Sequence, residues 1–133
     1  MIKGHCLCAA ICYQYSGEIG ELAVCHCQQC KRAQGTAFVT NAPIETAAFE
    51  VVSGALLMRS YFSSPNKKRV FCSRCGSPLY SQRTDMPELI RLRVGTISEG
   101  IIPQPSYQSF CESRSQWLQF AADLPQYPQT KDD

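Results

Sequence analysis

Cysteine dominates the potential chemistry of this 133-residue sequence, because seven of its nine cysteines fall into three short groups. The first group is a C-x-C pair, the second is a C-x-C-x-x-C cluster, and the third is a C-x-x-C-G turn. The members are Cys6 and Cys8, then Cys25, Cys27 and Cys30, and then Cys72 and Cys75. An odd number of cysteines makes a poor disulfide framework, since one thiol must stay unpaired. Thiolates at these spacings are typical zinc ligands, so we predict that the groups bind metal.

The C-x-C pair and the C-x-x-C-G turn together supply the four ligands of a closed site. Residues i and i+2 of an extended strand point to the same side, so Cys6 and Cys8 can face one ion. Gly76 follows the second cysteine of the turn, where a backbone with positive φ resists a side chain. Four sulfurs complete the tetrahedral shell of zinc and leave no position for a substrate. We therefore predict a structural zinc site that also uses Cys72 and Cys75.

The remaining cluster offers only three sulfurs, from Cys25, Cys27 and Cys30. Three protein ligands leave one position open, which is what a catalytic zinc needs for water or substrate. Cys12 or Cys111 could instead complete this cluster and close it, although neither has a partner at ligand spacing. The cluster could also consist of redox thiols without a metal.

Two histidines lie next to these cysteines, and we expect neither to be a ligand. His26 stands between two cysteines, so on a strand its side chain points away from them. His5 precedes Cys6, and we expect it at the surface.

The composition favours a folded, cytoplasmic domain that binds neither nucleic acid nor membranes. Hydrophobic residues make up 44% of the chain, charged residues 18%, and the net charge is only +2. The densest basic run, Lys67 to Arg69, is too short for a broad phosphate-binding surface. No apolar segment is long enough for a membrane span, and the start lacks the features of a secretory signal. Many cysteines in a reducing compartment again favour metal over disulfides.

Short alternating runs and frequent turn signals predict one mainly β domain over residues 1–133, with a frayed tail at 129–133. The expected strands cover 11–15, 21–25, 37–40, 49–52, 56–62, 68–72 and 79–82, and another begins at residue 89 and ends near 95–96. In that last strand Ile90 and Leu92 lie on one face, and Arg91 and Arg93 lie on the other. Residues 31–35 could form a helical turn, Pro43 should stop a strand, and residues 54 and 65 should mark hairpins.

The order of these motifs resembles the glutathione-dependent formaldehyde-activating enzyme family, whose domain is shared with centromere protein V. The motifs are C-x-C, C-H-C-x-x-C, S-S-x-x-x-x-R-x-F-C-x-x-C-G, V-G-T, a tryptophan and P-x-Y-P. The resemblance implies a β-tent fold of small antiparallel sheets stapled by two zinc ions, divided between the cysteines as above. Ala9, Ser98 and Gln108 stand where the family often has glycine, aspartate and histidine.

The resemblance implies a carbon–sulfur lyase that interconverts S-hydroxymethylglutathione with glutathione and formaldehyde. Three thiolates more than neutralise Zn²⁺, which favours holding a soft substrate thiolate over activating water. The carboxylates of glutathione require cations, for which the candidates are Lys31, Arg32, Arg59, Lys67, Arg69 and Arg114. Tyr61, Tyr80 or Tyr107 could assist proton transfer. The alternatives are a non-catalytic zinc module for protein interaction and a thiol redox or metal-buffering protein.

Overall fold

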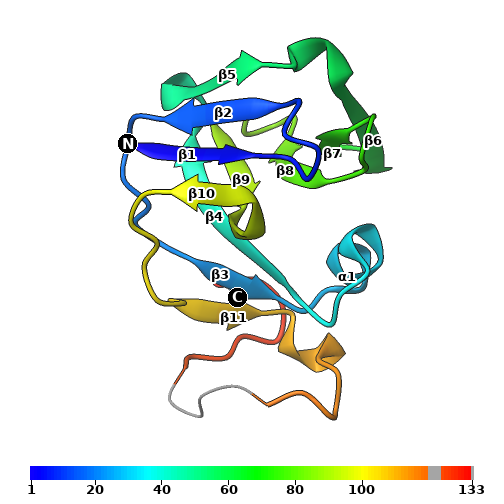
Figure 1. The fold of residues 1–133 in the computed structure, drawn as a ribbon. Coiled ribbons are helices and arrows are strands. Elements are labelled where there is room, and N and C mark those ends of the chain that lie inside the picture. The colour runs from blue at the N-terminus through cyan, green and yellow to red at the C-terminus, as the bar shows by residue number, and fades with distance from the viewer. Residues whose placement is uncertain (120–123, 133) are drawn as a thin grey trace.

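Short β-strands form most of the regular structure, which confirms the mainly β fold class (Figure 1). The computed structural model describes residues 1–119 and 124–132. The strands are β1 (Ile2–His5), β2 (Cys12–Tyr15), β3 (Ala23–Cys25), β4 (Val39–Glu45), β5 (Phe49–Ser53), β6 (Met58–Ser64), β7 (Lys67–Cys72), β8 (Pro78–Arg83), β9 (Leu89–Arg93), β10 (Ile97–Glu99) and β11 (Tyr107–Ser109). The helix α1 spans Gln28–Gln34, and 3-10 turns span Thr46–Ala48 (η1), Ala55–Leu57 (η2), Val94–Thr96 (η3) and Cys111–Ser113 (η4).

The strands form two sheets. The four-stranded sheet has the order β10-β1-β2-β5, and the seven-stranded sheet has the order β11-β3-β4-β9-β8-β7-β6. Strand pairs within the described residues are antiparallel, except that β11 runs parallel to β3. The sheets are therefore antiparallel as expected, with this one edge as the exception. The chain between β10 and β11 runs along the molecule and enters β11 in the direction of β3 (Figure 1).

The main core lies between the two sheets. Alternation along β2 buries Tyr13 and Tyr15, and alternation along β9 buries Ile90 and Leu92. Burying one such side chain contributes about 1.5–3 kcal/mol. The ring of Phe49 links the sheets, because its centroid lies 5.2 Å from that of Tyr13 and 5.7 Å from that of Tyr80 in β8.

The opposite face of the seven-stranded sheet is polar. The register pairs Arg69 with Ser81, Ser81 with Arg91, and Asn41 with Arg93. Directly paired residues, and residues two apart on one strand, project from the same face of a sheet. Alternate residues of these strands therefore project from one surface of the sheet. Ala23 pairs with Asn41 and so projects from this surface, and Cys25 does the same because it lies two residues further along β3.

The two expected hairpin turns have different outcomes. Residues 65 and 66 do connect β6 and β7, which pair as a hairpin. Gly54 does not form a hairpin, because β5 pairs with β2 in one sheet while β6 pairs with β7 in the other. Its φ of 79° redirects the chain between the sheets, and a Cβ at this position would collide with the carbonyl of Ala10.

The prediction that Pro43 stops a strand is wrong, because β4 continues to Glu45. Pro43 pairs with Arg91 of β9, whereas β3 pairs with β4 only as far as Asn41. After Asn41, the edge of β4 that faced β3 has no neighbouring strand, so a residue whose backbone N–H would point to that edge can be a proline.

The helix begins earlier than the sequence predicts. Helix α1 starts at Gln28 with Cys27 as its N-cap residue and ends at Gln34. The C-cap residue is Gly35, whose φ of 67° agrees with the predicted glycine stop. The first turn of the helix thus contains the end of the C-x-C-x-x-C cluster.

The C-terminal segment packs beside β11. The amide of Gln108 donates to the carbonyl of Pro125, and the amide of Phe110 donates to the carbonyl of Gln129. Lys131 forms an ion pair with Glu21. The described part of the tail that we expected to fray therefore makes defined contacts.

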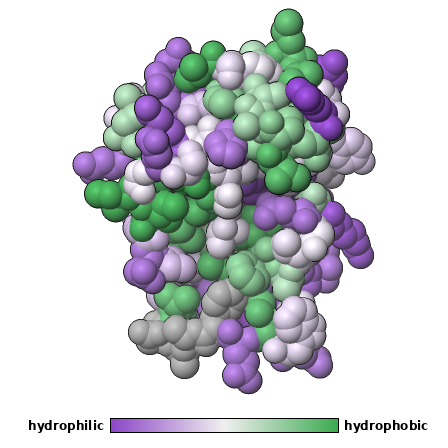
Figure 2. All heavy atoms as spheres, in the orientation of Figure 1, coloured by the Kyte–Doolittle hydropathy of each residue, from purple (hydrophilic) through white to green (hydrophobic). Residues whose placement is uncertain are grey.

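The surface mixes polar and apolar residues, which form separate patches in Figure 2. None of the helices in the described part of the chain has the length and apolar character of a membrane span.

Candidate metal centres

The four-cysteine cluster joins the two sheets. The Sγ atoms of Cys6, Cys8, Cys72 and Cys75 all lie within 4.8 Å of one another. Cys6 and Cys8 follow β1 of the four-stranded sheet, whereas the other two cysteines lie at the end of β7 and in the turn that follows it. Cys6 and Cys72 are fully buried, and Cys8 is exposed. An ion held by these sulfurs would fasten one sheet to the other.

Backbone geometry aims the four sulfurs at one point. The amide of Ile11 donates to Cys6 Sγ over 3.4 Å. Gly76 has a φ of 79°, as its place after C-x-x-C predicts, and its amide donates to the carbonyl of Cys72. Hydrogen bonds with the side chain and the backbone of Ser77 lower the pKa of Cys75 to about 5. A thiolate is thus favoured here at neutral pH, as metal binding requires.

Ala9 lies in a strained conformation beside this cluster. Its φ is 63°, a region that residues with a Cβ enter at a cost of about 1–2 kcal/mol. The amide of Ala9 donates to the carbonyl of Cys6, which closes the turn around the C-x-C pair. The resemblance implies glycine at position 9, and the positive φ of the backbone there favours glycine as well.

The three-cysteine cluster forms where β3 meets α1. The Sγ atoms of Cys25, Cys27 and Cys30 lie within 4.8 Å of one another. Cys25 ends β3, Cys27 caps α1, and Cys30 lies inside the helix. The amide of Cys30 donates to Cys27 Sγ over 3.2 Å, which fixes that sulfur above the first turn.

The electrostatics of this cluster favour negative charge on one sulfur. Hydrogen bonds from Cys25 and Cys27 lower the pKa of Cys30, and the positive charges of Arg93 and Lys67 act in the same direction. Hydrogen bonds with the other two cysteines, together with burial, raise the pKa of Cys25. Both shifts favour the thiolate form of Cys30 over that of Cys25, and a thiolate is the form that binds a metal ion.

Among the described residues, no fourth cysteine, histidine or carboxylate joins the three sulfurs. Cys12 lies in β2, and its thiol donates to the carbonyl of Ala9. Cys111 begins η4 outside the group. His26 is fully buried and its Nε2 lies 2.8 Å from Oε1 of Gln108, so it is a structural histidine as predicted. The geometry gives no support to a site closed by Cys12 or Cys111.

A cleft of about 410 Å³ opens onto the three-cysteine cluster. Its floor is the polar face of the seven-stranded sheet, and both Cys25 and Cys30 line it. Lys67, Arg91 and Arg93 also line it. Arg93 is only 5% exposed, and its Nη1 donates to the carbonyl of Arg91. The cleft is thus a positively charged cavity with sulfur ligands in its wall.

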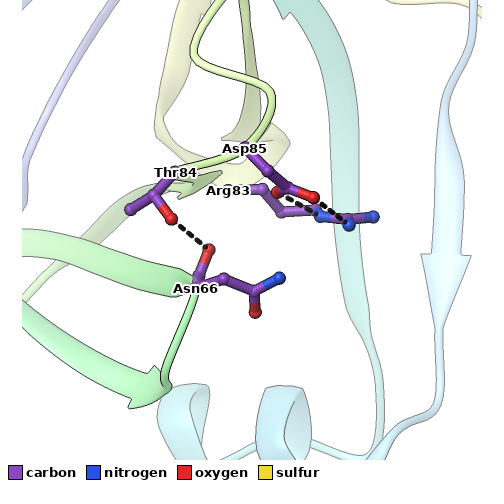
Figure 3. Close-up of polar contacts among 4 residues, drawn as sticks. All are labelled: Asn66, Arg83, Thr84 and Asp85. Carbon is purple, nitrogen blue, oxygen red and sulfur yellow. Dashed lines mark hydrogen bonds and ion pairs between the residues drawn. The ribbon is translucent and has the colours of Figure 1, made fainter.

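Two further cations at the rim of the cleft are already neutralised. Arg83 donates two hydrogen bonds to the carboxylate of Asp85, and Figure 3 shows the two side chains lying against each other. Lys131 pairs with Glu21. These two ion pairs are the only ones among the described residues, so the inner cations Lys67 and Arg93 have no carboxylate partner there.

Arg69 touches the cluster directly. It is 8% exposed, and its Nη1 and Nη2 atoms lie 3.6 and 3.7 Å from Cys30 Sγ. Its Nε donates to Ser63 Oγ over 3.0 Å, and its Nη2 donates to Gln29 Oε1 over 3.4 Å. These bonds hold the plane of the guanidinium group against the sulfur.

The comparison with known proteins agrees with these sites. The model of the glutathione-dependent formaldehyde-activating enzyme family matches residues 1–113. The chain belongs to this family. An uncharacterized lyase of Schizosaccharomyces pombe is 31% identical over 83 residues, which cover 62% of this chain. The match spans only 58% of that relative's own length.

A solved structure shares both the fold and part of the sequence. The crystal structure of a Rhodobacter sphaeroides protein superposes with a TM-score of 0.60 at 29% sequence identity. The match covers 76% of this chain and 91% of the other. The family resemblance suggested by the cysteine motifs is therefore confirmed.

The candidate substrate cations have mixed positions. Lys67 lines the cleft and Arg69 contacts Cys30. Lys31 donates to the carbonyl of Ser113, and Arg59 donates to the carbonyls of Leu56 and Met58. Arg32 and Arg114 are not part of the cleft wall.

Sequence reasoning missed Arg91 and Arg93 as site residues. Their alternation with Ile90 and Leu92 placed them opposite the core, which was correct. That signal alone did not show that the same face carries Cys25, because the pairing of β3, β4 and β9 is not readable from the sequence. The candidate tyrosines also divide, since Tyr107 lines the cleft whereas Tyr80 packs on Phe49.

Proposed function

We propose that this protein is a zinc-dependent carbon–sulfur lyase that makes and breaks an adduct of a thiol and an aldehyde, of the S-hydroxymethylglutathione type. The observation that carries the proposal is a cluster of only three cysteines in the wall of a cleft rich in unpaired cations. The family match and the lyase name of the yeast relative support the same class of reaction.

The donor atoms fit two zinc ions. Cys6, Cys8, Cys72 and Cys75 would hold a structural ion, and Cys25, Cys27 and Cys30 would hold the ion used in catalysis. When bound at the open site, zinc lowers the pKa of a substrate thiol so that the thiolate exists at neutral pH.

The charge around the three-cysteine cluster favours a thiol compound that also carries carboxylate groups. Three thiolates exceed the charge of one Zn²⁺ by a single negative charge, whereas Lys67, Arg69 and Arg93 bring three positive charges. The site without substrate therefore has a positive surplus at low solvent exposure, where unpaired charge is costly. Glutathione brings carboxylates as well as a thiolate, and it would supply the missing negative charge.

The chain's own residues can also stabilise the changing charge of the adduct. In the breakdown direction the hydroxyl of the adduct loses its proton, the C=O bond forms, and the electron pair of the C–S bond leaves with sulfur. The N–H groups of Arg69 lie beside Cys30 and would bind the oxygen while it carries negative charge. Burial raises the pKa of Tyr107 in the cleft wall, so its phenol keeps its proton and acts as a hydrogen-bond donor.

The proposal is tested by measuring zinc per chain together with the exchange of formaldehyde and glutathione by NMR. The wild type should contain two zinc ions and accelerate the exchange. Cys27→Ser should retain one zinc and lose the acceleration, whereas Cys12→Ser, which removes a cysteine outside both clusters, should change neither result. Two zinc ions without accelerated exchange would make the chain a binding module. Failure to bind the second zinc under reducing conditions would make the cluster a set of redox thiols.

A further inference from the structure

A second cavity of about 330 Å³ lies on the same sheet face as the cleft, on the far side of Arg69. We call it the aromatic pocket. Its walls include Ala33, Gln34, Tyr61, Arg69, Phe71 and Arg93. Since Arg93 also lines the cleft, the two cavities adjoin at this buried residue.

Strand register places the aromatic pocket next to the three-cysteine cluster. Tyr61 of β6 pairs with Arg69 of β7, and Phe71 follows two residues later, so all three belong to one face. The guanidinium group of Arg69 reaches from this wall to within 3.6 Å of Cys30 Sγ. A molecule in the pocket would therefore lie one side chain away from the sulfur cluster.

The walls of this pocket differ chemically from those of the cleft. The cleft has cysteine sulfurs and cations in its wall, whereas the pocket places the rings of Tyr61 and Phe71 and the side chain of Ala33 beside its two arginines. Tyr61 is 67% exposed, so its ring is available to pack against a ligand.

One polar group in the pocket wall lacks a partner. Oε1 of Gln34 is buried and accepts no hydrogen bond in the described part of the chain. Because this oxygen is itself buried, the exposed apolar walls determine what the pocket can take. An aromatic ring matches those walls.

We propose that the aromatic pocket binds a ring-bearing substituent on the carbonyl carbon of the substrate, so that the preferred aldehyde is larger than formaldehyde. The inference rests on the proposed function, because the three-cysteine cluster must be the place where the C–S bond is made and broken. The thiol part of the adduct lies in the cationic cleft, the ring lies in the pocket, and the carbon that joins them lies beside Arg69 and Arg93. Formaldehyde has no substituent and leaves this pocket unused.

The experiment compares two aldehydes in two matched variants. Ala33 is exposed on α1 at the pocket, so Ala33→Phe would fill the pocket without touching a cysteine. Arg32 precedes it, is exposed, and lines neither cavity, so Arg32→Phe adds the same ring to the same helix as a control. Exchange with glutathione is measured by NMR for 4-hydroxyphenylacetaldehyde and for formaldehyde.

The wild type should turn over the aromatic aldehyde with a kcat/KM at least about tenfold above that for formaldehyde, because the ring adds binding energy that formaldehyde lacks. Ala33→Phe should lower the aromatic rate at least about tenfold and change the formaldehyde rate less than about twofold. Arg32→Phe should change neither rate. Equal loss for both aldehydes in Ala33→Phe, or no loss for either, would overturn the proposal while leaving the lyase function in place.

A second readout does not depend on turnover. The unreactive alcohol 2-(4-hydroxyphenyl)ethanol should shift the backbone amide signals of Tyr61 and Phe71 in the wild type and not in Ala33→Phe. Absence of these shifts in the wild type would overturn the pocket assignment. Shifts without exchange of either aldehyde would overturn the lyase function, and with it the assignment of the ring to an aldehyde.

Discussion

The two cysteine clusters use the same ligand atom in opposite settings. The four-cysteine cluster takes its sulfurs from both sheets, and its ligands are far apart in the chain. The three-cysteine cluster takes all its sulfurs from residues 25–30, at the edge of one sheet and the start of a helix. The first arrangement can hold distant segments together, whereas the second adds little to the fold and leaves space beside the sulfurs.

The two clusters differ in the charge of the groups around their sulfurs as clearly as they differ in the number of cysteines. Backbone amides and Ser77 surround the sulfurs of the four-cysteine cluster. Lys67, Arg69 and Arg93 surround Cys30 in the other cluster, without a carboxylate partner among the described residues. A site that only stabilises the fold does not require cations beside its sulfurs, so under the proposed function these cations bind a ligand that brings negative charge.

The largest difference between the clusters should appear in stability. Cys72→Ser removes a fully buried ligand that ties β7 to β1, and losing a structural metal typically costs more than about 4 kcal/mol. The variant should be unfolded at 37 °C or should melt at least about 10 °C lower than the wild type in circular dichroism. A normal melting temperature would show that the four-cysteine cluster does not hold the sheets together.

Removal of a ligand from the other cluster should have the opposite profile. Cys27→Ser should lower the rate of glutathione–formaldehyde exchange by a factor on the order of 10² or more, because the open metal site is lost. Its melting temperature should fall by less than about 4 °C. The reason is that Cys25, Cys27 and Cys30 lie within six consecutive residues, so an ion held by them links no distant parts of the chain. A large loss of stability with intact exchange would contradict the division of roles.

The unpaired cations give a sharper test of the second cluster. Arg93→Met removes a buried positive charge from the cleft while retaining most of its volume, and a charge-assisted hydrogen bond is worth about 1.5–3 kcal/mol. The KM for glutathione should rise about 10- to 100-fold, whereas Arg32→Met, an equal charge change outside the cleft, should leave it unchanged. An unchanged KM in Arg93→Met would show that the positive cleft does not bind the thiol's carboxylates.

The smallest effect is expected at Ala9, beside the four-cysteine cluster. Ala9→Gly relieves the strain of a φ of 63° but loosens the unfolded chain, so the net gain in unfolding free energy should be about 0.5–1 kcal/mol. Thermal unfolding should show a melting temperature a few degrees higher, with unchanged exchange activity. A lower melting temperature would mean that the Cβ of Ala9 makes a contact worth more than the strain.

The sequence predicts the three cysteine groups because the spacing within each group is local. The C-x-C and C-x-x-C-G spacings correspond to the sulfurs that gather in the structure, and Gly76 adopts the predicted positive φ. Most strands were also predicted, since alternation along β2 and β9 reflects the burial of Tyr13, Tyr15, Ile90 and Leu92 on the core side.

The parts that were missed depend on pairing between distant segments. Pro43 lies within a strand because β3 ends before it, and Gly54 links two sheets because β5 and β6 have different partners. Arg93 faces Cys30 through the register of β3, β4 and β9. No short window of sequence contains this information, so the cationic cleft became visible only in three dimensions.

The central claim is that one cluster is closed and the other accepts a thiol. Zinc K-edge X-ray absorption of the wild type, with and without glutathione, tests it most directly because it counts the sulfur atoms around zinc. The average sulfur coordination should rise when glutathione is added to the wild type and should stay constant in Cys27→Ser, where only the closed site holds zinc. An unchanged sulfur count in the zinc-loaded wild type at saturating glutathione would contradict the claim.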